Sequence, residues 1–139
     1  MGQTADIVTE TLVNWLQGLN PDAILSVDAA AIDPSAIAID LRLTNLALEP
    51  QALHAQSRQQ AGGISPPAAT LRLDYFITIH APDPLVKHRI LGEVAFALFD
   101  HPVFSMAPEG EIIVRFRPND SGRLGLAISA SVVDNRPTP

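Results

Sequence analysis

Two histidines and an aspartate lie close enough in the sequence to form a small polar site. His80 and His88 are separated by a short segment that contains Asp83. Imidazole nitrogens and a carboxylate can bind a divalent metal or exchange protons with a substrate. His88, however, stands between Lys87 and Arg89, which is typical of the solvated side of a helix. A small-molecule- or metal-binding α+β domain is therefore the alternative interpretation of this chain.

The other residues that could perform covalent chemistry are scattered. His54 and His101 belong to different segments, no serine stands in a G-x-S-x-G pattern, and Gly62-Gly63 is not followed by the Lys-Ser or Lys-Thr pair of a phosphate loop. The chain has no cysteine, which excludes disulfides and a thiolate nucleophile. We therefore expect no catalytic residue, no metal and no cofactor, and predict that the protein is not an enzyme.

Composition narrows the choice of partners and compartment. The 139 residues carry 15 acidic and 9 basic side chains, a net charge of −6 that would repel a nucleic acid. The first residues lack the basic region of a signal peptide, and no apolar run approaches the roughly 20 residues that span a bilayer. We expect no nucleic-acid or membrane partner, and a soluble chain that folds in a reducing cytoplasm.

The first half of the chain predicts a helix followed by two strands. Apolar residues recur at helical spacing over Thr4–Leu19, and Asn20-Pro21 ends that pattern. A short apolar run follows at Ala23–Asp28, and apolar and polar residues alternate from Ser35 to Leu43. The dipeptide Asp33-Pro34 between the two runs is a turn signal, so we expect them to form a hairpin.

The second half predicts a strand, a helix and two more strands. Alternation over Leu71–His80 indicates a central strand with one buried face. Asp83 and Pro84 are typical of a helix start, and an apolar stripe runs from there to Phe99. Glu111–Arg117, with Ile112, Val114 and Phe116 buried, and Leu124–Val133 alternate again. The fold class is therefore α+β: a mainly antiparallel sheet with two helices packed on one face. We expect one domain over residues 1–134 and a disordered tail over residues 135–139.

Two features are candidates for a partner interface. Residues 49–69 form a long polar stretch without periodicity, and loops of this length are usually functional or disordered. Arginines concentrate in the last predicted hairpin, where a positive patch on an acidic protein could bind an acidic partner; the alternative is a solvated strand face. The candidate interface residues are Arg58, Ile64, Arg115, Arg117 and Arg123.

Four segments resemble the N-terminal domain of cap proteins from contractile injection systems. They are the strand Leu71–His80, the helix stop Leu98–Phe104, the opening helix Ala5–Leu16 and the entry Ser65–Pro67, in a match over about residues 5 to 117. The resemblance implies a phage tail-terminator-like fold. It also implies a hexameric ring on the end of the inner tube, bound to the last layer of sheath, without covalent chemistry. Another phage tail-completion or adaptor protein is the alternative within this class.

Overall fold

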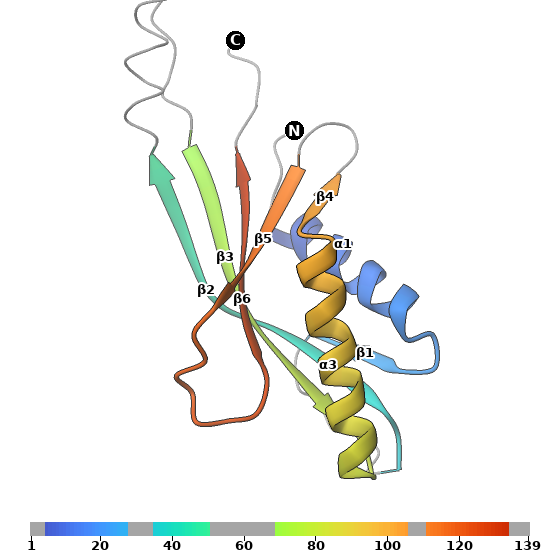
Figure 1. The fold of residues 1–139 in the computed structure, drawn as a ribbon. Coiled ribbons are helices and arrows are strands. Elements are labelled where there is room, and N and C mark those ends of the chain that lie inside the picture. The colour runs from blue at the N-terminus through green and yellow to red at the C-terminus, as the bar shows by residue number, and fades with distance from the viewer. Residues whose placement is uncertain (1–4, 28–34, 51–68, 106–110, 134–139) are drawn as a thin grey trace, which may run out of the picture.

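The computed structural model describes residues 5–27, 35–50, 69–105 and 111–133, which form two helices and six strands (Figure 1). Within these residues the predicted α+β class is confirmed. Along the chain, the elements are α1 (Ala5–Leu19), β1 (Ile24–Ser26), β2 (Ala38–Pro50), β3 (Ala69–His80), α3 (Pro84–Asp100), β4 (Val103–Ser105), β5 (Glu111–Arg117) and β6 (Leu126–Val133).

The strands form one sheet in the order β1-β2-β3-β6-β5-β4. All neighbours are antiparallel except β1 and β2, which are parallel, with Ile24 opposite Ala38. The predicted hairpin between these two runs is therefore wrong. A tight turn would have reversed the chain, whereas residues 27–37 are numerous enough to carry it back to the starting end of β1. The Ile24 N–H donates to the Ile37 carbonyl at 2.9 Å and fixes this arrangement.

The strands β2 and β3 form a long two-stranded ribbon. They are paired from Ala38 opposite His80 to Pro50 opposite Ala69, with a register shift between Leu43 and Asn45. In Figure 1 the far end of this ribbon extends beyond both helices. The rest of the predicted loop, residues 51–68, lies outside the described residues.

Helix α1 packs on the sheet through three buried residues one turn apart, Val8, Leu12 and Leu16. Two contacts fix it further. The rings of Trp15 and Phe104 meet edge to face with centroids 5.2 Å apart, and the hydroxyls of Thr9 and Tyr75 share a hydrogen bond of 2.7 Å. Burial raises the pKa of Tyr75, although the bond to Thr9 opposes that effect. Trp15 is thus a packing residue.

Helix α3 starts and ends where the sequence predicts. The Leu85 N–H donates to Asp83 Oδ1 at 2.9 Å, Pro84 follows the cap, and the His101 N–H donates to the Ala97 carbonyl at 2.9 Å. Its buried face, Ile90, Val94 and Leu98, joins α1 and the sheet in one hydrophobic core.

Each strand of the central sheet has a face toward this core and an open face. The core face carries Leu73, Tyr75 and Ile77 on β3, and their neighbours on β6. Phe116 also lies on the core face but is 44% exposed, so its predicted burial is wrong. The reason is that β4 pairs with β5 only over Glu111–Ile113, which leaves the end of β5 at the edge of the sheet.

Two glycines should respond oppositely to alanine. A Cβ on Gly92, inside α3, would meet nothing within 4 Å, so Gly92→Ala should raise the free energy of unfolding by about 0.5–1 kcal/mol. Gly122 has a φ of 75°, which an alanine adopts only with strain, so Gly122→Ala should lower the free energy of unfolding by about 1 kcal/mol. Urea titration monitored by circular dichroism measures both changes. Equal signs for the two variants would contradict the assigned backbone.

Candidate protein-interaction site

The structure does not assemble His80, Asp83 and His88 into a site. The Asp83 carboxylate caps α3, and His88 is exposed on that helix. In the described ranges, no three His, Cys, Asp or Glu side chains are grouped as metal ligands would be. The metal-binding interpretation is therefore not favoured. The helices in these ranges are also too short or too polar to cross a bilayer.

The open face of the sheet is built from rows of paired residues that run across four strands. One row contains Arg42, Phe76, Ala127 and Arg117, each opposite the next. The neighbouring row contains Asn45, Asp74, Ser129 and Arg115. Because paired residues on neighbouring strands point to the same face, the register brings side chains from β2, β3, β6 and β5 together.

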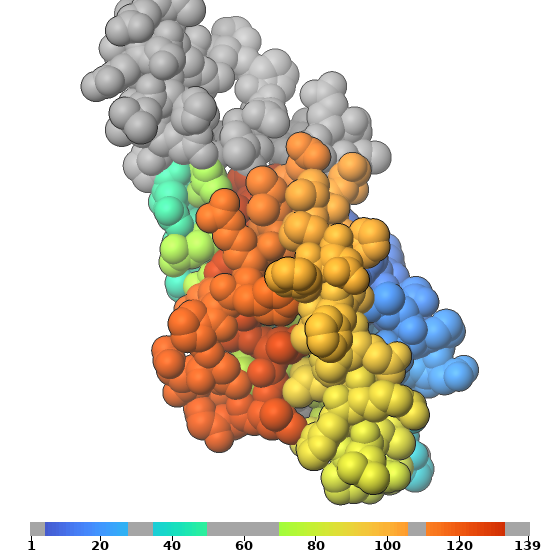
Figure 2. Space-filling model, viewed as in Figure 1, coloured from blue at the N-terminus to red at the C-terminus, as the bar shows by residue number. Residues whose placement is uncertain are grey.

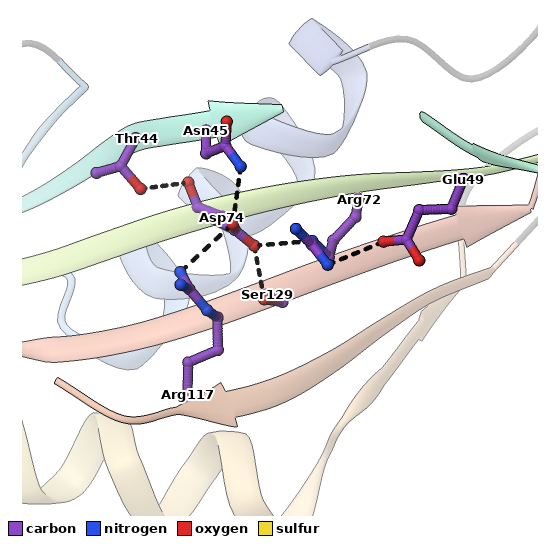
Figure 3. Close-up of polar contacts among 7 residues, drawn as sticks. All are labelled: Thr44, Asn45, Glu49, Arg72, Asp74, Arg117 and Ser129. Atoms are coloured by element: carbon purple, nitrogen blue, oxygen red, sulfur yellow. Dashed lines mark hydrogen bonds and ion pairs between the residues drawn. The ribbon is translucent and has the colours of Figure 1, made fainter. Parts of the chain in front are cut away.

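Asp74 is the centre of the second row (Figure 3). Only 3% of its side chain is exposed. Its carboxylate accepts hydrogen bonds from Ser129 Oγ at 2.7 Å and Asn45 Nδ2 at 3.3 Å. It also lies 3.4 Å from Arg72 Nε and 3.5 Å from an Arg117 guanidinium nitrogen. One buried carboxylate thus holds four side chains from four strands.

These contacts determine the ionisation of Asp74. Burial raises the pKa of this carboxyl, but the hydrogen bonds from Ser129 and Asn45 and the charges of Arg117 and Arg72 outweigh burial and bring the pKa below its usual 3.8. The group is therefore a carboxylate at neutral pH, and its charge offsets part of the charge of two arginines.

The structure brings some of the predicted interface residues together. Arg115 and Arg117 lie on the open face of β5, and Arg123 stands in the loop between β5 and β6, with its guanidinium 5.8 Å from the centre of the Phe76 ring. That loop is held by Asn119, whose Nδ2 donates to the Arg123 carbonyl at 2.7 Å. Arg58 and Ile64 lie outside the described residues.

Sequence reasoning missed Arg42 and Arg72, which join the same face from β2 and β3. Both alternate with apolar residues in their strands, a pattern that does signal an outward position. What the sequence lacks is the register that places Arg42 in the row of Arg117. With these two residues, five of the nine basic side chains of the protein belong to the open face and its loop.

A groove of about 330 Å³ lies on this face between the bulge of β2 and the loop before β6. Arg42, Arg117 and Arg123 line it, together with Phe76 and Ala127. The short side chain of Ala127, between Phe76 and Arg117 in its row, leaves the hollow. A second hollow of about 320 Å³ shares Arg42 and Arg123 with the first and continues toward His80.

Two apolar surfaces lie outside the core. On β2, Leu43, Leu46 and Leu48 face the core side of the ribbon but are 39%, 50% and 66% exposed, because neither helix extends over them. On α3, Leu85, Phe96 and Phe99 are more than 70% exposed and lie on one side of the helix. Figure 2 shows α3 at the surface, with its outer side uncovered by any other described element in this view.

These features define a class of protein: a small α+β domain whose sheet is covered by helices on one side and presents a charged, grooved face on the other. Residues 5–120 match the Pvc16 N-terminal domain family, and the chain belongs to that family. The family resemblance that the sequence predicts is therefore confirmed.

The fold is similar to a solved structure, the sheath/tube terminator of an extracellular contractile injection system, PVC, in its extended state. The TM-score is 0.68 at 18% sequence identity, over 99% of this chain and 58% of that one. At this identity the similarity shows the fold, and the chain spans little more than half of the terminator's length. A comparison with curated protein sequences found no match.

Proposed function

We propose that this protein is a structural terminator subunit, which ends the inner tube of a contractile injection system and anchors the sheath there. The observation that carries the proposal is the shared fold: nearly the whole chain superposes on a sheath/tube terminator, within the family to which the chain belongs. Such a subunit acts by binding and performs no covalent chemistry. It would assemble in the bacterial cytoplasm and leave as part of an extracellular particle.

The two exposed apolar surfaces support a role in assembly. Soluble monomers rarely expose large contiguous apolar surface, so patches of this kind usually mark contacts between proteins. The leucines of β2 and the phenylalanines of α3 belong to different elements. A contact between the β2 leucines of one copy and the α3 phenylalanines of the next would be head to tail, and contacts of that type form a ring when the rotation from one subunit to the next closes. We propose a ring of six subunits with this contact.

The outer edge of β2 supports a contact with the sheath. On its inner side β2 is paired with β3. In the described ranges, β1 covers the outer side only from Ala38 to Asp40, so no strand lies along the outer side from Leu41 to Pro50. Unpaired backbone N–H and C=O groups accept an added strand. We propose this edge, with the adjoining residues 51–68 that include Arg58 and Ile64, as the place where a sheath or tube segment binds.

Introducing one negative charge on the exposed side of α3 tests whether this side forms the contact between subunits of the proposed ring. Phe96→Glu should leave the fold intact, because 74% of Phe96 is exposed, but should convert oligomers to monomers since a carboxylate would be buried at the contact. Size-exclusion chromatography with light scattering measures the mass. The matched control is Asn14→Glu, which adds the same charge to an exposed position on α1. Oligomers of unchanged mass in Phe96→Glu would contradict a contact through α3.

A further inference from the structure

We propose that the groove on the open face, lined by Arg42, Arg117 and Arg123, binds an acidic, extended segment of the tube or sheath protein. The inference rests on the proposed function for the identity of the partner. The chemistry of the segment, by contrast, follows from the groove itself.

The charge balance of the face leaves guanidinium groups available. Arg72 is paired with Glu49 at 2.9 Å and shares Asp74 with Arg117. Arg42 lies 3.9 Å from Asp40, so Asp40, Glu49 and Asp74 each offset one arginine of the face. In the part of the chain that the structure describes, Arg115 and Arg123 have no acidic partner. A surface that concentrates unneutralised arginines on a protein of net charge −6 is complementary to carboxylates.

The shape of the groove favours a side chain over a free ion. Arg42 and Arg117 stand at the two ends of the row Arg42–Phe76–Ala127–Arg117, and Arg123 approaches from the loop. Phe76 forms an apolar floor between them. A glutamate or aspartate could place its carboxylate among the guanidinium groups, which donate in a planar fork, while its methylenes or an adjacent apolar residue pack on the ring.

The second hollow extends the site in one direction. It is lined by Asp40, Thr78 and His80, and two buried atoms there, Asp40 Oδ1 and His80 Nε2, have no hydrogen-bond partner among the described residues. Buried polar atoms are normally paired. The two hollows share Arg42 and Arg123, so together they fit an extended peptide with its carboxylates at the arginine end.

Nucleic acid is a poorer match for the same arginines. Asp40, Glu49 and Asp120 lie among or beside them, and a continuous phosphate backbone would approach all three. Repulsion by these carboxylates is small for a short peptide with spaced acidic residues and large for a polyanion.

Binding to the purified tube and sheath proteins of the same particle tests the groove. Arg123→Glu should weaken the affinity for one of them about tenfold or more in biolayer interferometry, because it replaces attraction by repulsion. Arg123→Lys keeps the positive charge but lacks the planar, paired donors of the guanidinium, so its affinity should lie between those of Arg123→Glu and the natural chain. Arg123 is exposed, has no acidic partner in the described part of the chain and contacts the Phe76 ring only at 5.8 Å, so thermal midpoints of these variants should lie close to that of the natural protein.

The matched control is Arg89→Glu, which reverses an exposed arginine on α3 that pairs with Glu93. It should change the affinity less than about twofold. If Arg89→Glu and Arg123→Glu weakened the affinity equally, or if neither weakened it, the proposed binding at the groove would be wrong, while the proposed terminator role would stand. Failure of the natural chain to bind either protein would contradict both proposals. Tight binding of a fluorescein-labelled 20-nucleotide single-stranded DNA, abolished by Arg123→Glu, would also overturn the choice of an acidic protein segment.

Discussion

Replacing Asp74 with alanine is expected to lower the free energy of unfolding by about 3 kcal/mol. The variant leaves Ser129 and Asn45 without their shared acceptor, and Arg117 without a counter-charge among the described residues. This loss lies at the lower end of the range that is usual when one partner of a buried ion pair is removed. The arginine side chains are about 40% exposed, so water can solvate them. Urea unfolding measures the loss, with Glu49→Ala as the control: Glu49 is half exposed, so its ion pair should contribute less than about 1 kcal/mol.

The pH dependence separates the charge of Asp74 from its packing. Since the pKa of Asp74 is lower in the folded protein than its usual 3.8, the carboxylate stabilises the fold fully above that pH, and the contribution is lost as the pH falls through the folded value. The stability difference between the natural chain and Asp74→Asn should therefore be constant from about pH 5 to 7 and shrink below about pH 3.8. A difference that stays constant down to about pH 2 would show that the charge of Asp74 does not stabilise the fold.

Replacing Gly125 with alanine is expected to cost about 2–3 kcal/mol. An added Cβ would lie 2.6 Å from Phe76 Cζ and 2.7 Å from the Ile77 carbonyl oxygen. The ring could turn aside, but the carbonyl belongs to β3, whose Ile77 pairs with Leu126 directly after the glycine. The variant must therefore separate β3 from β6 at this end or distort the loop.

Thermal and urea unfolding of Gly125→Ala measure this cost, and Gly92→Ala, which has free space, is its matched control. Because Phe76 forms the floor of the groove, the same variant should weaken binding of the tube or sheath protein even at temperatures where it is folded. Unchanged stability in Gly125→Ala would mean that the loop stands farther from Phe76 than the structure places it.

Local patterns predict much of this fold. Alternation over Leu71–His80 identifies the central strand β3, and Asp83 with Pro84 marks the first turn of α3. Both signals are local: a strand shows its buried face every second residue, and a cap needs only its own turn. The direction of β1 is not a local property. Its three residues are too few to indicate whether β2 runs beside them parallel or antiparallel.

The binding face required information that a single sequence does not contain. Arg42 and Arg117 are in one row only because β3 and β6 lie between their strands in a fixed register. The register shift after Leu43 likewise determines that Leu46 and Leu48 face the core side of the ribbon. Asp74 alternates with apolar residues as an exposed strand residue would, yet it is buried in contact with Ser129 of β6 and Arg117 of β5.

The proposed terminator role makes one direct prediction about whole particles. Electron microscopy of particles from cells that lack this chain should show inner tubes of variable length without anchored sheath, and the natural chain should restore a uniform length. Particles of uniform length with normal sheath in the absence of the chain would contradict the role.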